Sequence, residues 1–324
     1  MKPIANILAT VALAATLGAN AAGYPDRPVT WVVPFAPGGA TDTLGRVFAE
    51  RMARGAAQSI VVDNVPGAGG TAGAARVARA QPDGYTFLVG HVGYMAAAPS
   101  LYKDLAYDPV KDFDAVARFP DTPMVLVCGP RLQPRTIGEL IEFARAHPGT
   151  LNFGNAGVGS AGHLVAALFE SVVKADIVNV PYKGNAPAMS DIIGGRVDCM
   201  FDQSNTALPQ VRGGKVAALA VTSRDRIPQL PDVPTLQEAG LAGFEAATWY
   251  GIYAPRGTSP EALRWIVDRF GQAMQDRAFT DNLVQQGYVM VPPAERGPAA
   301  LASQTQREVE RWRKVVADAH IQAN

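Results

Sequence analysis

Runs of residues typical of β-strands alternate with runs of helical periodicity along most of this chain. The first helical run, residues 41–54, places Leu44, Phe48 and Met52 on one face and ends at Gly55. This alternation predicts an α/β fold in which helices flank mainly parallel sheets. The chain has 324 residues, more than the usual size of one domain, and 48% of them are hydrophobic. We therefore expect two lobes, each built around its own sheet.

The N-terminus has the features of a secretory signal peptide. Lys2 provides a positive charge, residues 7–17 are mostly apolar, and Ala19-Asn20-Ala21 matches an A-x-A cleavage site. The apolar stretch is shorter than the roughly 18–20 residues that a membrane-spanning helix needs. We therefore expect residues 1–21 to be a signal peptide, cleaved near Ala21, and the mature protein to be exported.

The polar composition argues against several classes of partner. Without Lys2 and the rest of the signal peptide, the chain has 28 Lys and Arg residues and 29 Asp and Glu residues. This near-neutral mixture is not typical of proteins that bind nucleic acids or acidic membrane surfaces. The four histidines lack the spacing of metal ligands, so we expect no metal and no cofactor. For Cys128 and Cys199 one disulfide is an alternative, but we favour two small, buried, unpaired residues.

Two segments mark where the chain crosses between the lobes. Residues 104–120 are polar and rich in turn-forming residues, and a strand follows at residues 124–128. The return crossing is expected around Thr248-Trp249-Tyr250. The chain is thereby divided into lobe 1, residues 24–123 and 248–324, and lobe 2, residues 124–247.

The segment from Val32 to Asp42 is the first candidate functional loop. An apolar strand at residues 29–33 runs into a turn rich in proline and glycine, and a helix then opens near Thr41. The first N–H groups of a helix lack intrahelical acceptors and lie at the positive end of its dipole. A strand-to-helix turn of this kind presents several backbone donors at one point, and therefore predicts an anion-binding site.

A second loop, in the other lobe, has the same character. Residues 155–160, Asn-Ala-Gly-Val-Gly-Ser, leave a strand and enter a helix, and Ser160 is a suitable N-cap. Glycines allow the backbone to approach a ligand closely. We expect the two loops to face each other across a cleft between the lobes. Other residues that could line this cleft follow strand ends or lie in the return crossing: His91, Tyr94, Tyr182, Asp202, Thr248 and Trp249.

Three motifs for other functions are matched only in part. Residues 157–162 read G-x-G-x-x-G, but the next strand does not end in the acidic residue that would hold a dinucleotide ribose. Ser160 and His163 suggest a hydrolase, yet Val158 stands where the nucleophile elbow needs glycine. An N-cap serine also directs its oxygen at the backbone N–H of His163. Residues 64–70 lack the Lys-Ser/Thr of a phosphate-binding loop, and tight packing of a small-residue helix explains their glycines.

From Tyr24 to the C-terminus the chain resembles the periplasmic solute receptors of tripartite tricarboxylate transporters, known as the Bug receptors. The motifs that carry the resemblance are spread over both lobes and occur in order. They are Tyr-Pro-Asp-Arg-Pro at 24–28, Val-Pro-Phe-Ala-Pro-Gly-Gly-Ala-Thr-Asp at 33–42, Pro-Gly-Ala-Gly-Gly at 66–70, Pro-Asp-Gly-Tyr-Thr at 82–86, Tyr-Asp-Pro at 107–109, Gly-Val-Gly-Ser at 157–160 with His-Leu at 163–164, Val-Pro-Tyr-Lys-Gly at 180–184, Leu-Pro-Asp-Val-Pro-Thr at 230–235 and Trp-Tyr-Gly at 249–251.

The resemblance implies a two-lobed, type II-like periplasmic binding protein that closes on a small organic mono- or dicarboxylate. It also implies delivery of that ligand to a membrane transporter of the tripartite tricarboxylate type. In the family both loops grip the carboxylate largely through backbone groups and ordered water, which agrees with the lack of Arg and Lys in them. Asn155 stands where the family usually has Ser, and Val65 where it usually has Lys or Arg.

The predicted ligand-binding residues come from both loops and from nearby strand ends. They are Phe35, Ala36, Gly38, Gly39, Thr41, Asp42, His91, Asn155, Gly157, Ser160, His163, Tyr182 and Asp202. We expect a monomer without catalytic activity. Two alternatives stay open: a carboxylate receptor that serves a membrane sensor kinase, and an exported serine hydrolase that uses Ser160 and His163.

Overall fold

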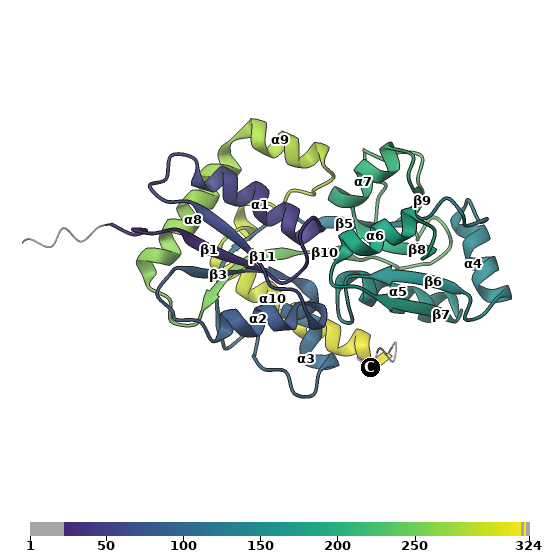
Figure 1. The fold of residues 1–324 in the computed structure, drawn as a ribbon, viewed down its shortest axis with the longest axis horizontal. Helices are drawn as coiled ribbons and strands as arrows, with labels where there is room; N and C mark the ends of the chain where they lie inside the picture. The colour runs from purple at the N-terminus through teal and green to yellow at the C-terminus, as the bar shows by residue number, and fades with distance from the viewer. Residues whose placement is uncertain (1–22, 319–320, 322–324) are drawn as a thin grey trace, which may run out of the picture.

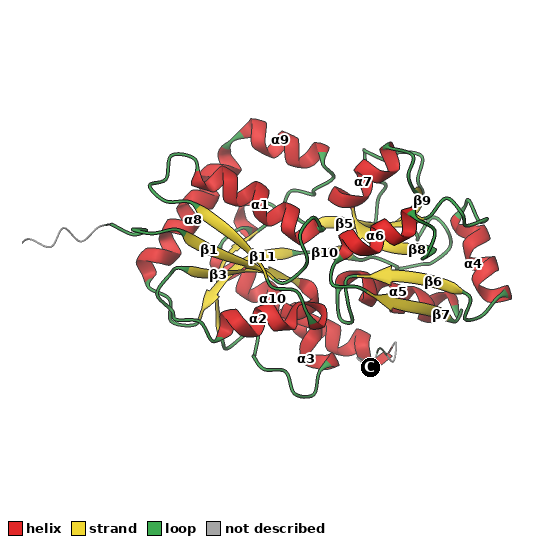
Figure 2. Cartoon of the chain, viewed as in Figure 1, coloured by secondary structure: helices red, strands yellow, loops and turns green. Residues whose placement is uncertain are grey.

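Two sheets, one in each lobe, organise the computed structural model of the chain (Figures 1 and 2). The structure describes residues 23–318 and 321, so the predicted signal peptide lies outside the described residues. The predicted two-lobed α/β architecture is confirmed, with helices on both faces of each sheet. Within the described residues, none of the helices is long and apolar enough to span a membrane.

The lobe 1 sheet has the strand order β2-β1-β3-β11-β4. Its strands are β1 (Val29–Val33), β2 (Ile60–Asn64), β3 (Thr86–His91), β4 (Phe113–Arg118) and β11 (Tyr250–Pro255). Side chains alternate along β1: Trp31 packs in the cluster around Phe48, and Val32 packs in the cluster around Ala74 on the opposite face. Both faces are therefore buried, which explains why every residue of β1 except Thr30 is apolar.

The lobe 2 sheet has the strand order β10-β5-β8-β6-β7, with β9 beside β5. Its strands are β5 (Thr122–Cys128), β6 (Leu151–Asn155), β7 (Ile177–Pro181), β8 (Cys199–Gln203), β9 (Ala217–Val221) and β10 (Ala247–Thr248). β6 is parallel to β7 and β8, whereas β5 is antiparallel to β8, β9 and β10.

The α-helices cover these sheets, and four of the described helices begin with a side-chain cap. They are α1 (Ala40–Ala53), α2 (Thr71–Ala78), α3 (Ala98–Leu101), α4 (Ile137–Ala146), α5 (Ala161–Val173), α6 (Asn185–Ile193), α7 (Ser204–Arg212), α8 (Pro260–Gln275), α9 (Arg277–Gln285) and α10 (Pro298–Asp318). Short non-α turns lie at Ala68–Gly70, Gly93–Ala97 and Pro293–Glu295. Thr136 and Glu139 form a capping box before α4, and Ser259 caps α8 ahead of Pro260.

The strand directions confirm one sequence prediction, and the cysteines contradict another. Both sheets are mainly parallel, as predicted, and each contains one reversed strand. The chain enters lobe 2 along β5 and returns to lobe 1 along β11, and each of these strands is antiparallel to its neighbours. The preference for unpaired cysteines is wrong: Cys128 and Cys199 form a disulfide. These residues lie directly opposite each other in the β5–β8 ladder, a pairing that their separation of 71 residues does not reveal.

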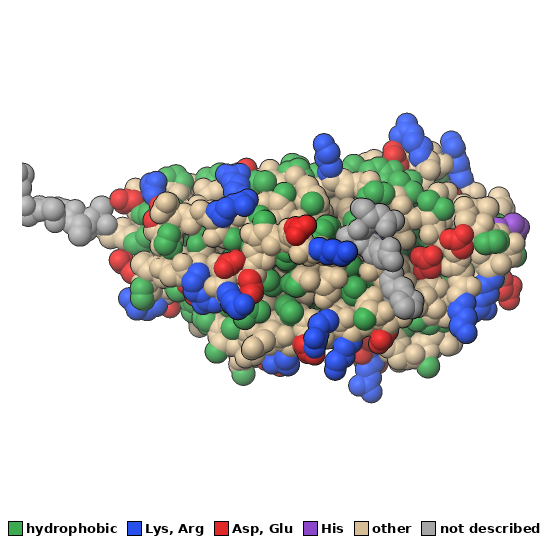
Figure 3. All heavy atoms as spheres, turned by 90° about the horizontal axis from the view of Figure 1, so that it is seen from below, with side chains coloured by type: hydrophobic (Ala, Val, Ile, Leu, Met, Phe, Trp, Pro, Cys, Tyr) green, Lys and Arg blue, Asp and Glu red, His purple; other side chains and the backbone are tan. Residues whose placement is uncertain are grey.

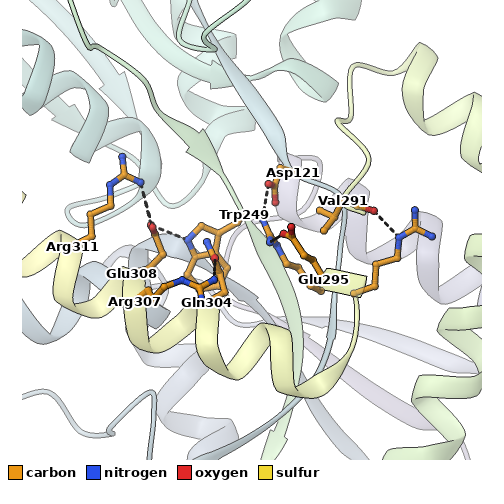
Figure 4. A network of polar contacts seen from close by, with 10 residues as sticks. Asp121, Trp249, Val291, Glu295, Gln304, Arg307, Glu308 and Arg311 are labelled. Atoms are coloured by element: carbon orange, nitrogen blue, oxygen red, sulfur yellow. Dashed lines mark hydrogen bonds and ion pairs between the residues drawn. The ribbon is translucent and has the colours of Figure 1, made fainter. Parts of the chain in front are cut away.

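The two crossing segments lie side by side, and the C-terminal region fastens both of them (Figure 4). The indole Nε1 of Trp249 donates to a carboxylate oxygen of Glu308 on α10, 3.2 Å away. Arg118, at the end of β4, pairs with Asp121 at 2.7 Å and with Glu295 at 2.9 Å. The crossings run between β4 and β5 and between β10 and β11, so the strands of lobe 2 begin at Thr122 and end at Thr248.

The lobes are closed on each other. Direct hydrogen bonds join them: the N–H of Ala36 donates to the carbonyl of Lys183 at 3.0 Å, and the hydroxyl of Tyr102 donates to the carbonyl of Val158 at 2.7 Å. Asn205 reaches across to the carbonyl of Ala40 at 3.2 Å. Away from this contact, the face seen in Figure 3 carries basic and acidic side chains interspersed over its surface, as the balanced composition predicts.

Candidate ligand cavity between the lobes

The two predicted loops meet around a small, partly open cavity. The lobe 1 loop follows β1 and enters α1, and the lobe 2 loop follows β6 and enters α5. Both loops leave the carboxyl end of a parallel strand, which is where open α/β sheets place their ligands. The cavity is lined by Phe35, Gly39, Ala40, Thr41, His91, Ala156, Ser160, Ala161, Gly162, Asn185 and Gln203.

The N-terminal ends of four helices converge on this cavity. Lining residues include the first residues of α1, α5 and α6 and the N-cap of α7, which are Ala40, Ala161, Asn185 and Gln203. The first turn of each helix leaves backbone N–H groups without intrahelical acceptors, at the positive end of the helix dipole. The residues that line the cavity include no Lys or Arg. Attraction for an anion therefore comes from neutral donors and oriented dipoles.

The side chain of Asp42 shapes the first loop from behind. Its carboxylate accepts the N–H of Gly38 at 2.9 Å, the guanidinium of Arg46 at 3.0 Å and the amide of Asn64 at 2.9 Å. Burial alone would raise the pKa of Asp42, but these hydrogen bonds outweigh it and hold the pKa below its ordinary value. Asp42 and Gly38 do not line the cavity, so their contribution to the site is the shape of the turn.

The second loop is held by its own side chains. Asn155 Oδ1 accepts the N–H of Gly157 at 3.0 Å, and His163 Nδ1 accepts the N–H of Gly159 at 3.3 Å. The hydroxyl oxygen of Ser160 accepts the N–H of His163 at 3.4 Å, which is the N-cap contact predicted from the sequence. Ser160 lines the cavity, whereas His163 and Asn155 lie behind it. The Nδ1 atom of the His163 ring thus faces the loop backbone.

His91 contributes a fixed neutral donor from lobe 1. It is the last residue of β3, it is 1% exposed, and burial lowers its pKa to about 3. Its Nδ1 accepts the N–H of Gly93 at 3.0 Å, so the neutral ring carries its proton on Nε2. Phe35 packs edge-on against the ring, and Tyr94 stacks on it. His91 lines the cavity, whereas Tyr94 stays in the core behind it.

A wider and more open cavity lies outside the first, and Ala156 belongs to both. Three of the predicted residues, Ala36, Gly157 and Tyr182, line this outer space. The hydroxyl of Tyr182 donates to Asp191 at 2.8 Å. Thr248 and Trp249 line neither cavity, because they belong to the return crossing.

The glycine-rich segment at residues 67–70 also belongs to the site, although packing of its own helix seemed to explain it. A Cβ atom on Gly69 would lie 1.9 Å from the carbonyl oxygen of Val158 in the lobe 2 loop. Gly67, Ala68 and Gly69 line the outer cavity. These glycines therefore permit close contact between the loops of the two lobes. In addition, no group of three or more His, Cys, Asp or Glu suited to a metal ion occurs within residues 23–318.

The family model of the Tripartite tricarboxylate transporter family receptor matches residues 44–321. The chain belongs to this receptor family. Among solved structures, this chain is similar to the periplasmic binding protein BugD, with a TM-score of 0.89 and 38% identity. That similarity covers 93% of this chain and 100% of BugD.

Two solved relatives of this receptor contain ligands. MatC from Rhodopseudomonas palustris, with bound malate, has a TM-score of 0.87 and 40% identity, over 90% of this chain and 100% of MatC. Rpa4515 of R. palustris, with adipate, has a TM-score of 0.88 and 35% identity, over 92% of this chain and 99% of that one. The resemblance noted in the sequence is thereby confirmed at the level of the family.

Proposed function

We propose that this receptor captures a small organic carboxylate in the cavity between its lobes, in the periplasm, as a monomer. The observation that carries the proposal is the convergence of four helix N-termini on one cavity whose lining has no cationic side chain. A carboxylate accepts several N–H donors at once and carries the negative charge that this arrangement attracts. The malate and adipate seen in MatC and Rpa4515 support the same class of ligand.

We further propose that the closed receptor delivers its ligand to the membrane subunits of a tripartite tricarboxylate transporter. Family membership supports this step. Binding without catalysis is supported by the site itself, because the Ser160 oxygen caps a helix and the His163 Nδ1 is occupied by a backbone N–H. A signal peptide ending near Ala21 would bring the protein to the periplasm.

Isothermal titration of the mature protein against mono-, di- and tricarboxylates tests capture. We expect saturable heat and a raised melting temperature with at least one carboxylate, and no heat with an amine of similar size. An absence of binding to every carboxylate would overturn the proposal. Ester hydrolysis that disappears in Ser160→Ala would instead show a hydrolase.

Uptake measurements test delivery. A strain that lacks this receptor should lose uptake of the carboxylate that binds in titration, and the gene in trans should restore it. Unchanged uptake together with a lost transcriptional response to that carboxylate would favour a sensor kinase as the partner.

A further inference from the structure

A second contact between the lobes lies where α9 ends. Residues 284–289, at the end of α9 in lobe 1, lie beside the start of α7 in lobe 2 (Figure 1). The hydroxyl of Ser204 donates to the carbonyl of Gly287 at 2.7 Å, and the side-chain amide of Gln229 donates to the carbonyl of Val284 at 2.5 Å. A Cβ atom on Gly287 would lie only 2.9 Å from that of Ser204. We call this close contact the α9–α7 seam.

Asn205 is the buried centre of the α9–α7 seam. Its Nδ2 group donates to the hydroxyl oxygen of Tyr288 at 2.8 Å and to the carbonyl of Ala40 at 3.2 Å, and both partners belong to lobe 1. Asn205 is 6% exposed, and Tyr288 is 2% exposed. A carbonyl can only accept, so the amide must present its NH₂ group to Ala40, and the second proton then meets the Tyr288 oxygen. Both protons of the group are therefore used to join the lobes.

The seam is connected to the ligand cavity through two helix starts. Ala40, the first residue of α1, lines the cavity from lobe 1, and Gln203, the N-cap of α7, lines it from lobe 2. Asn205 follows Gln203 by two residues and bonds to Ala40, so it holds the two helix starts together. Asn205 and Tyr288 do not line the cavity themselves. Their influence on a ligand must therefore pass through the positions of α1 and α7.

The start of α7 is rigid enough to transmit that influence. Asp202, one of the predicted ligand-binding residues, is 0% exposed and does not line the cavity. Its carboxylate accepts the backbone N–H of Gln203 at 2.9 Å and the hydroxyl of Thr206 at 2.8 Å, and it also accepts from the amide of Asn185. These hydrogen bonds tie the first turn of α7 together, so a displacement of Asn205 also displaces Gln203.

The lobe 1 side of the seam is fixed to the first crossing between the lobes. The N–H of Asp121 donates to the carbonyl of Val289 at 3.0 Å, and the N–H of Val289 donates to the carbonyl of Asp121 at 2.8 Å. The N–H of Tyr288 donates to the carbonyl of Leu283, which is buried in the core of lobe 1. Tyr288 is thus held at both sides within lobe 1 and the crossing, and Asn205 is the partner that leaves when the lobes separate.

We propose that Tyr288 and Asn205 are positioning residues, which hold the starts of α1 and α7 together in the closed state and thereby control the affinity for a ligand that they do not touch. Separation of the lobes breaks both hydrogen bonds of the Asn205 NH₂ group and exposes it to water. A variant without the Tyr288 hydroxyl leaves one of these protons buried without an acceptor in the closed state only, and so disfavours closure. This inference rests on the proposed function and adds the residues that control closure around the ligand.

Tyr288→Phe tests this inference, and Tyr253→Phe is its matched control. Both hydroxyls are buried and hydrogen-bonded, but that of Tyr253 pairs with Thr305 at 2.6 Å inside lobe 1. Each variant is titrated with malate, adipate, citrate and benzoate, and its unfolding by urea is measured. Tyr288→Phe should weaken every carboxylate that the wild type binds by the same factor, about 5- to 150-fold. Tyr253→Phe should keep the wild-type affinity, although both variants should unfold at lower urea concentrations.

A double-mutant cycle tests whether the two residues act as one contact. Asn205→Leu replaces the amide with an apolar group of similar size, and should weaken the same carboxylates at least about fivefold. No donor then remains for the hydroxyl of Tyr288, so adding Tyr288→Phe should cost less than about a further twofold. Losses that multiply in the double variant would show that the two residues act separately, and would overturn the inference.

The outcomes separate this inference from the proposed function. If the wild type binds none of the four carboxylates, both fail. Wild-type affinity in Tyr288→Phe, with the urea midpoint lowered as in Tyr253→Phe, would show a purely structural role and overturn the inference alone. A loss that differs from one carboxylate to the next would mean that Tyr288 acts on the ligand directly, and this would also overturn the inference while carboxylate capture stands.

Discussion

A methyl group on Gly69 tests whether ligand affinity depends on closure of the lobes. In the closed structure its Cβ would lie 1.9 Å from the Val158 carbonyl oxygen, whereas real Cβ atoms essentially never come within 3.0 Å of another group. The two loops would have to separate by about 1.1 Å, the difference between these distances. The same carbonyl accepts the Tyr102 hydroxyl at 2.7 Å, and Ala36 donates to Lys183 nearby at 3.0 Å.

The expected loss of carboxylate affinity follows from the loss of these two interlobe hydrogen bonds. At about 0.5–1.5 kcal/mol each, they stabilise the closed state by about 1–3 kcal/mol. Gly69→Ala should therefore weaken carboxylate binding about 5- to 150-fold in isothermal titration. Small-angle scattering of the ligand-saturated variant should show a larger radius of gyration than the saturated wild type, because the lobes cannot close fully.

A matched control separates this effect from backbone strain. Gly69 has φ +60°, and Gly214, in the turn after α7, has φ +64° with open space for 4 Å around the position that a Cβ would take. Both alanine variants should lose about 1 kcal/mol of stability from the left-handed backbone. Only Gly69→Ala should lose affinity. If the two variants bind with equal affinity, the interlobe contact does not control binding, and the reasoning fails.

Three further variants probe the backbone donors, the buried carboxylate and the crossing. Ala161→Pro deletes one N–H at a position where helices tolerate proline, and should weaken binding at least tenfold by titration, whereas Ala161→Gly keeps the N–H and should not. Burial raises the pKa of Asp202 to about 6. Asp202 therefore stabilises the folded state fully at pH values below its ordinary pKa, and this stabilisation is lost as the pH rises through 6. Asp202→Asn should therefore raise the free energy of unfolding by up to about 3 kcal/mol at pH 8 but little at pH 4, in urea titrations; a difference independent of pH would contradict this. Trp249→Phe leaves Glu308 without the indole donor and should cost about 1–3 kcal/mol of stability in urea unfolding, and an unchanged midpoint would show that this contact does not stabilise the crossing.

Local chemistry made the two loops predictable from the sequence. A strand, a glycine-rich turn and a helix start are adjacent in the chain, so the strand-to-helix turn within residues 32–42 could be predicted without tertiary information. The N-cap contact of Ser160 was predictable for the same reason. The helix start at α6 carried a weaker signal, because Gly184 precedes Asn185 and leaves the cap without a side chain.

The remainder of the site depends on contacts that are distant in sequence. Strand β4 was missed because the region before and through it is rich in polar and turn-forming residues, although Phe113 and Val116 are fully part of the lobe 1 core. Helix α7 was missed because Pro209 interrupts its pattern. With α7 absent from the prediction, the position of Gln203 as an N-cap at the cavity could not be inferred. The contact that requires Gly69 exists only between lobes.

The division of the site between the lobes connects its chemistry to its motion. Lobe 2 contributes the starts of α5, α6 and α7, and lobe 1 contributes the start of α1 together with His91. No single lobe presents the complete set of donors, and the lining residues provide no cation that would hold an anion strongly by itself. The affinity for a carboxylate must then fall as the lobes separate, because each donor that moves away is replaced by water. A guanidinium on either lobe would weaken this dependence, since it would retain the ligand in the open state. A cavity of neutral donors, divided as it is here, makes opening itself the step that releases the ligand.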